Sequence, residues 1–87
     1  MAGSIKCRRV CSRPAALRFM PDAVAAEILD LSLEELESLR LCDLEGLDQE
    51  TAARRMGVSR GTLQRIIYSA HAKVAEALCT GKGIFIN

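Results

Sequence analysis

The chain has 87 residues, 49% of them hydrophobic, so it suits one small domain and is too apolar for a disordered tail. No apolar run approaches the roughly 20 residues that cross a bilayer. The basic N-terminus also lacks the apolar segment of a secretory signal, so we expect no membrane association and predict a cytoplasmic protein.

The net charge of +1 conceals a strong segregation of charge along the chain. Residues 1–18 hold five basic and no acidic residues, residues 19–50 hold ten acidic and one basic, and residues 51–87 hold six basic and one acidic. Small domains often segregate charge by chance. Two basic segments around an acidic one are nevertheless typical of a protein that presents a polyanion-binding face on an acidic scaffold.

The N-terminal part is predicted to be an extended basic arm, residues 1–22, because its two prolines limit regular structure. A short strand is expected at Lys6–Val10 or at Leu17–Met20. The next stretch, Asp22–Leu31, contains helix-forming residues but is short. We predict a turn of helix or an ordered loop there.

The first long helix is predicted over Leu33–Glu45, with Ser32 as its N-cap and Glu35 completing a capping box. Gly46 then ends the helix. Arg40 lies on the inward side, and we expect a structural salt bridge to a neighbouring acid. The apolar residues predicted to face inward are Leu33, Leu36 and Leu44, with Leu39 and Leu41 beside them.

Two further helices follow, at Gln49–Met56 and Arg60–Cys79. Asp48 and Ser59 are the predicted N-caps, and Gly57 ends the first of the two. One apolar stripe at helical spacing runs along the longer helix. Its members are Leu63, Ile66, Ile67, Ala70, Val74, Ala77 and Leu78.

The C-terminal residues GIFIN come after Gly81, which ends the last helix. Their hydrophobicity alternates weakly along the chain. This alternation indicates a short terminal strand. The N-terminal arm is its expected partner, from the same chain or from a second one.

The segment Gln49–Tyr68 fits a helix-turn-helix at each position where that motif is demanding. It has a small residue at the closest helix approach, a turn glycine, an apolar plug, a cap and two apolar anchors. These are Ala53, Gly57, Val58, Ser59, and Leu63 with Ile66. A helical hairpin that only packs is the alternative.

The outward face of the third helix favours DNA binding over simple packing. Gly61, Gln64, Arg65 and Tyr68 lie opposite the stripe, and no acid occurs between Glu50 and Glu76, so the face does not repel phosphate. Arg60, Gln64 and Arg65 are predicted to reach base edges, and Gly61 to allow close approach. The predicted phosphate contacts are Ser59, Thr62, Tyr68, Arg54, Arg55 and Lys73, with Arg8 and Arg9 from the arm.

The cysteines and the single histidine give no pattern typical of a metal site or an enzyme. Cys7 and Cys11 form one close pair without a second, so reduced thiols that bind no metal are expected, although a zinc site with Cys42, Cys79 or His71 is an alternative. His71 has no Ser, Asp or second His at triad-like spacing, and no phosphate-binding glycine loop follows a strand. We predict no catalytic activity, no cofactor and no metal.

The stretch LRLCDLEGLDQETAARRMGVSRGTLQRIIYSAHAKVAEAL resembles region four of bacterial sigma factors. The chain is still more similar to a prokaryotic family of inferred DNA-binding proteins, domain-of-unknown-function family one-three-four. The matching segments are Cys7–Val10, Arg18–Pro21, Leu36–Leu47, Ala52–Arg60 and Gly81–Ile86. The resemblance implies a sigma-region-four-like helix-turn-helix with a transcriptional role. It also implies that many relatives carry a longer C-terminal region, and the chain departs from the family pattern at Gly61, Leu63 and Gln64.

The predicted fold is therefore mainly α: a basic arm at 1–22, a helix-turn-helix domain with a three-helix core at 23–80, and a short strand or tail at 81–87. The predicted function is sequence-specific binding of double-stranded DNA as a transcriptional regulator. One such helix covers few base pairs, so we expect a homodimer. The alternative is a protein-interaction module that contacts RNA polymerase or another regulator through the acidic helix at Glu34–Glu45.

Overall fold

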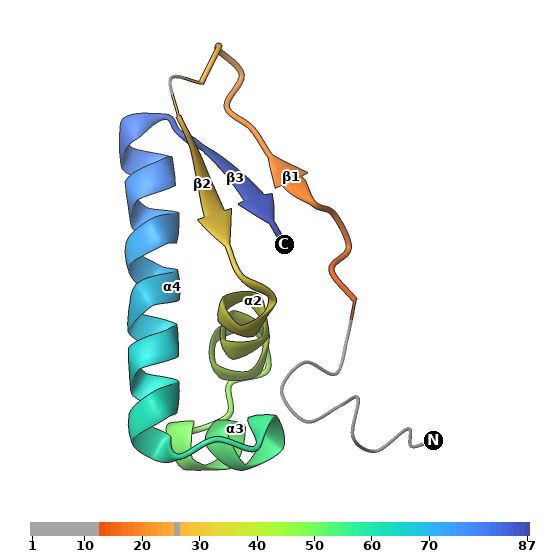
Figure 1. The fold of residues 1–87 in the computed structure, drawn as a ribbon, viewed down its shortest axis with the longest axis vertical. Coiled ribbons are helices and arrows are strands. Elements are labelled where there is room, and N and C mark those ends of the chain that lie inside the picture. The colour runs from red at the N-terminus through yellow and green to blue at the C-terminus, as the bar shows by residue number, and fades with distance from the viewer. Residues whose placement is uncertain (1–12, 26) are drawn as a thin grey trace.

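The computed structural model describes residues 13–25 and 27–87, which form a helical domain with a small sheet at one end (Figure 1). In chain order the elements are β1 (Arg18–Phe19), β2 (Ile28–Leu31), α2 (Leu33–Leu39), the π-helical η1 (Arg40–Leu44), α3 (Gln49–Met56), α4 (Arg60–Thr80) and β3 (Gly83–Ile86). The long α4 spans the molecule, with α3 across its first turns and the sheet beside its C-terminal half. The prediction of a mainly helical fold is confirmed.

The helix boundaries follow the predicted caps. Ser32 and Glu35 form the capping box at the start of α2, and Asp48 and Ser59 cap α3 and α4 through their side chains. Gly57 and Gly81 end α3 and α4 in the left-handed conformation, at φ values of 71° and 73°. That conformation is costly for residues with a Cβ, so these glycines set where the two helices stop.

The predicted helix over Leu33–Glu45 exists but changes pitch at Arg40. The N–H of Glu45 donates to the carbonyl of Arg40 at 2.9 Å, an i to i−5 bond of a π-helix. A π turn contains one more residue than an α-helical turn. A helical wheel drawn at α-helical pitch therefore assigns the side chains of this turn to the wrong faces. Leu41 is consequently fully buried, whereas Leu44 is 80% exposed and its predicted inward position is wrong.

Among the described residues, two clusters of buried apolar side chains lie along α4. The first, where α3 packs on α4, contains Leu41, Ala52, Ala53, Met56 and Leu63, with Val58 and Ile66 partly buried against it. The second, between α4 and the sheet, contains Leu31, Ala70 and Ile86. Leu78 is 78% exposed, so its predicted place in the buried stripe is wrong, whereas its neighbour Ala77 is only 5% exposed.

The sheet has the order β1-β3-β2, with β3 antiparallel to β1 and parallel to β2. The predicted terminal strand and its pairing with the arm are confirmed, within one chain, with Arg18 opposite Phe85. The other candidate strand of the arm, Lys6–Val10, lies outside the described residues. The turn or loop predicted over Asp22–Leu31 is wrong for its last four residues, which form β2. A short isolated helix is marginal in water, whereas the strand gains a full register with β3.

Candidate nucleic-acid interface

The turn between α3 and α4 has the geometry that its sequence predicts. The N–H of Val58 donates to the carbonyl of Ala53 at 3.0 Å, and the Val58 side chain packs on the first core cluster. The N–H of Thr62 then donates to the Ser59 hydroxyl at 3.1 Å, which begins α4. The two helices are thereby held against each other through Ala53 and Leu63, both buried.

The face of α4 opposite this contact is open to solvent. Gly61, Gln64, Arg65 and Tyr68 are all exposed, as the stripe predicted, and Tyr68 is 77% exposed. The same four residues line one shallow groove together with Gln49, Ile67 and His71. The structure therefore brings together the four residues predicted to lie opposite the stripe.

Three more of the predicted contact residues add positive charge to the two helices that carry this groove. Arg54, Arg55 and Arg60 are exposed on the last turn of α3 and the first turn of α4. The Thr51 backbone and side chain lower the pKa of Asp48, and the charges of Arg54 and Arg60 act in the same direction. No acidic residue occurs in the sequence from Thr51 to Ala75. The exposed charge along this part of α3 and α4 is therefore basic.

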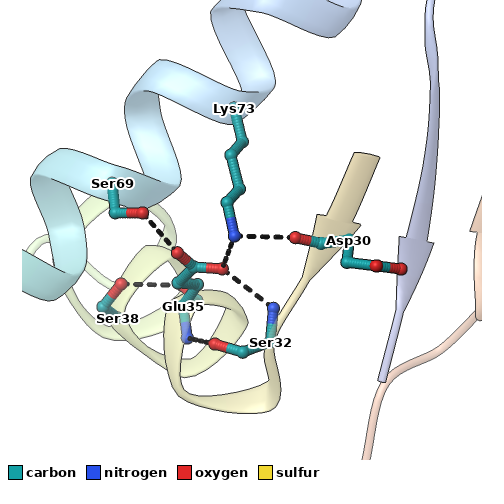
Figure 2. Close-up of polar contacts among 6 residues, drawn as sticks. All are labelled: Asp30, Ser32, Glu35, Ser38, Ser69 and Lys73. Atoms are coloured by element: carbon teal, nitrogen blue, oxygen red, sulfur yellow. Dashed lines mark hydrogen bonds and ion pairs between the residues drawn. The ribbon is translucent and has the colours of Figure 1, made fainter. Parts of the chain in front are cut away.

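Lys73, which the sequence predicted to contact the DNA backbone, forms an ion pair within the protein. Its ammonium donates to Glu35 Oε1 at 2.9 Å and to the carbonyl of Asp30 at 2.7 Å (Figure 2). The charge of Lys73 is thus neutralised on the side of α4 that packs against α2 and β2. This placement gives no support to the predicted phosphate contact.

Glu35 is the centre of a polar junction that joins three elements (Figure 2). It accepts from the N–H of Ser32 at 2.9 Å, from the Ser69 hydroxyl at 2.5 Å and from Lys73. Burial alone raises the pKa of this carboxyl, but the donors of Ser69, Ser32 and Lys73 outweigh it and lower the pKa below its ordinary value. A charged Glu35 therefore fixes α4 to the start of α2.

The acidic helix presents fewer charges than its sequence suggests. Besides Glu35, Glu37 is only 3% exposed and binds the guanidinium of Arg40 at 2.7 Å. Arg40 also contacts Glu45 at 2.5 Å, so the predicted structural salt bridge of Arg40 is confirmed. Glu35 and Glu37 serve the fold, and charge reversal there would test stability rather than partner binding.

The described thiols show no sign of a shared ligand. Cys42 is half-buried and Cys79 exposed, and both are free. Burial, with Asp43 and Asp48 nearby, raises the pKa of Cys42. Within residues 13–25 and 27–87, no three His, Cys, Asp or Glu side chains gather as metal ligands would. Cys7 and Cys11, like Arg8 and Arg9, lie outside the described residues.

Sequence reasoning missed three residues at this face. Gln49 and His71 line the groove, and His71 Nε2 lies 2.6 Å from Asp43 Oδ2 of η1. The π turn that positions Asp43 left no recognisable sequence signal. Thr51, which accepts a hydrogen bond from Arg54 at 3.3 Å, had one: the spacing from cap to Thr to Arg recurs as Ser59, Thr62 and Arg65.

Among the helices that the structure describes, none combines the length and the apolar character needed to cross a bilayer.

Comparison with known proteins finds relatives that carry the name UPF0251 protein. The chain is 54% identical to a UPF0251 protein of Prosthecochloris aestuarii, 51% identical to one of Desulforudis audaxviator and 54% identical to one of Thermoanaerobacter pseudethanolicus, in each case over at least 93% of its own length. It spans 54%, 56% and 72% of those three relatives. No solved structure matches it.

The profile of the family described as "Protein of unknown function DUF134" matches residues 2–87, almost the whole chain. The predicted family resemblance is thereby confirmed, and the chain belongs to the DUF134 family of proteins of unknown function.

Proposed function

We propose that the protein binds double-stranded DNA sequence-specifically, through a sigma-region-four-like helix-turn-helix formed by α3, the turn at Gly57 and α4. One observation supports this most strongly. Between Thr51 and Ala75 the two helices expose arginine, glutamine and tyrosine side chains, and the sequence of that stretch contains no acid. Such a surface attracts phosphate and carries the donors that recognise base edges.

In this proposal α4 is the recognition helix. Arg60, Gln64 and Arg65 contact base edges in the major groove, where Arg favours guanine and Gln favours adenine. Gly61 permits close approach of the helix. The remaining contacts are to phosphate and come from Ser59, Tyr68, Arg54 and Arg55, with Arg8 and Arg9 of the arm adding sequence-independent attraction.

We further propose that the protein acts as a transcriptional regulator and as a homodimer. A single recognition helix contacts few base pairs, so a second half-site raises specificity. At the sheet end, remote from α3, Phe19, Met20 and Leu78 expose large apolar side chains that a second copy could cover. Light scattering after size exclusion at micromolar concentration tests this, and a clean monomer there argues against the dimer.

Selection of duplexes from a random pool tests the DNA proposal. The wild-type protein should enrich one motif, and Arg65→Ala and Gln64→Ala should each cost about 1–3 kcal/mol on it. Arg18→Ala is the matched control, because Arg18 lies over the Phe85 ring at the sheet end, 5.2 Å from its centroid. If the two α4 variants bind the enriched duplex as the control does, α4 is not the recognition helix.

A further inference from the structure

One hydrogen-bond pattern occurs twice, once on each helix of the candidate interface. In α3 the cap Asp48 accepts from the N–H of Thr51 at 2.7 Å, and the Thr51 hydroxyl accepts from Arg54 Nη2 at 3.3 Å. In α4 the cap Ser59 accepts from the N–H of Thr62 at 3.1 Å, and the Thr62 hydroxyl accepts from Arg65 Nη2 at 3.2 Å. Both series of hydrogen bonds run from cap to threonine to arginine at the same spacing along the helix.

The α4 copy carries additional restraint. The Ser59 hydroxyl also donates to the Thr62 hydroxyl at 3.0 Å, which fixes the oxygen that Arg65 uses. Nη1 of Arg65 lies 4.0 Å from the point where a Cβ on Gly61 would stand, so the guanidinium lies back over Gly61. Arg65 therefore extends toward the N-terminal end of α4 with one edge of its fork bound to Thr62. The Arg65 residue is exposed, and Thr62 is the only described residue to which its guanidinium donates a hydrogen bond.

Neighbouring arginines provide an internal contrast. Arg55 and Arg60 are also exposed on these helices, yet neither side chain donates a hydrogen bond to any described residue. The threonine partner is thus specific to Arg54 and Arg65. An exposed arginine otherwise samples many rotamers, and binding must restrict them at an entropic cost.

We propose that Thr51 and Thr62 are positioning residues, which hold the guanidinium groups of Arg54 and Arg65 in the orientation used to bind DNA. The inference rests on the proposed function and deepens it. Arg65 faces the groove with Gln64 and Tyr68, so Thr62 acts on base discrimination. Arg54 lies on α3 outside that groove, so Thr51 acts on sequence-independent affinity. The direct phosphate contact that the sequence predicted for Thr62 is thereby replaced by an action through Arg65.

The first test uses the free protein and needs no DNA. Nitrogen relaxation at the arginine Nε sites should show Arg54 and Arg65 more ordered than Arg55 and Arg60. Thr62→Val keeps the shape and the backbone N–H that Ser59 caps but removes the hydroxyl, so it should lower the order of Arg65 alone. Thr62→Ser should restore it. Equal mobility of all four wild-type arginines overturns the inference, whatever the protein binds.

The second test is a mutant cycle on DNA, with a random 20-base-pair duplex pool and the duplex that the wild-type protein enriches from it. Thr62→Val should reduce the preference for the enriched duplex by about two- to tenfold, the cost of ordering one long side chain. In an Arg65→Ala background the same change should have no effect. Thr51→Val should weaken both duplexes equally, and only while Arg54 is present.

The outcomes separate the two proposals. A Thr62→Val effect that persists in the Arg65→Ala background means that Thr62 contacts DNA directly, and no effect in either background means that the restraint is irrelevant; both overturn the inference alone. A wild-type protein that enriches no duplex overturns the proposed function and the inference with it. Thermal melting of each variant ensures that only folded protein is compared.

Discussion

Removal of the Glu35 carboxylate is expected to destabilise the protein strongly. In Glu35→Ala the Ser32 N–H and the Ser69 hydroxyl lose their acceptor, and the Lys73 ammonium loses its counter-ion at the junction of α2, α4 and β2. A hydrogen bond to a charged group contributes about 1.5–3 kcal/mol and a neutral one about 1 kcal/mol. The Lys73 side chain is 35% exposed, which reduces the penalty for leaving it unpaired. We expect the free energy of unfolding to fall by about 2–4 kcal/mol.

Glu35→Gln is the matched control, since it keeps the shape and one acceptor oxygen but removes the charge. It should cost less than Glu35→Ala, because the Ser32 N–H can keep its acceptor. Urea denaturation followed by circular dichroism measures both variants against the wild type. A loss below about 1 kcal/mol for Glu35→Ala would contradict the account of the junction.

The pH dependence of stability provides a second test of this carboxylate. The folded pKa of Glu35 lies below its ordinary value of 4.5, so its contribution is present above that pH and is lost as the pH falls through the folded pKa. The wild type should therefore lose stability below about pH 4.5 more steeply than Glu35→Gln does. Other carboxyls titrate equally in both proteins, so the difference isolates Glu35. Parallel curves would refute the lowered pKa.

The remaining predictions concern the π turn, the glycine turn and the arm. Leu41→Ala should lower the free energy of unfolding by about 2–5 kcal/mol, whereas Leu44→Ala should change it by no more than about 0.5 kcal/mol. Similar losses for the two variants would contradict the π turn and favour a continuous α-helix. Gly57→Ala should lower the free energy of unfolding by about 1–2 kcal/mol because its φ is 71°, and a neutral result would argue against that turn. Arg8→Ala and Arg9→Ala should weaken all duplexes evenly and flatten the salt dependence of binding by about one unit of slope for each phosphate that is no longer neutralised; an unchanged slope excludes the arm from the interface.

The parts of the fold that were predictable are those fixed by local chemistry. Ser32, Asp48 and Ser59 cap their helices because their side chains accept from an N–H three residues on, and this spacing is visible in the sequence. Gly57 and the stripe around Leu63 likewise determine how α3 and α4 pack. The exposed set at Gly61, Gln64, Arg65 and Tyr68 followed from that stripe.

The features that were missed depend on contacts between distant segments. β2 forms because Ile28–Leu31 pairs with β3, more than 50 residues away, and that pairing overrides a weak helical preference. The π turn lets Leu41 enter the core and leaves Leu44 in solvent. Lys73 was assigned to DNA because its charge is visible in the sequence, whereas its partner Glu35 is 38 residues away. The sequence of one helix cannot reveal which of its charges a neighbouring element neutralises.

Amide chemical-shift mapping with the enriched duplex tests the central claim most directly. We predict that the largest changes fall on α3, the turn at Gly57 and the first three turns of α4, with little change on β2 or α2. Arg65→Ala should remove most of these changes. Changes centred on the sheet or on α2, or a protein that binds every duplex equally well, would contradict the claim that α4 is the recognition helix.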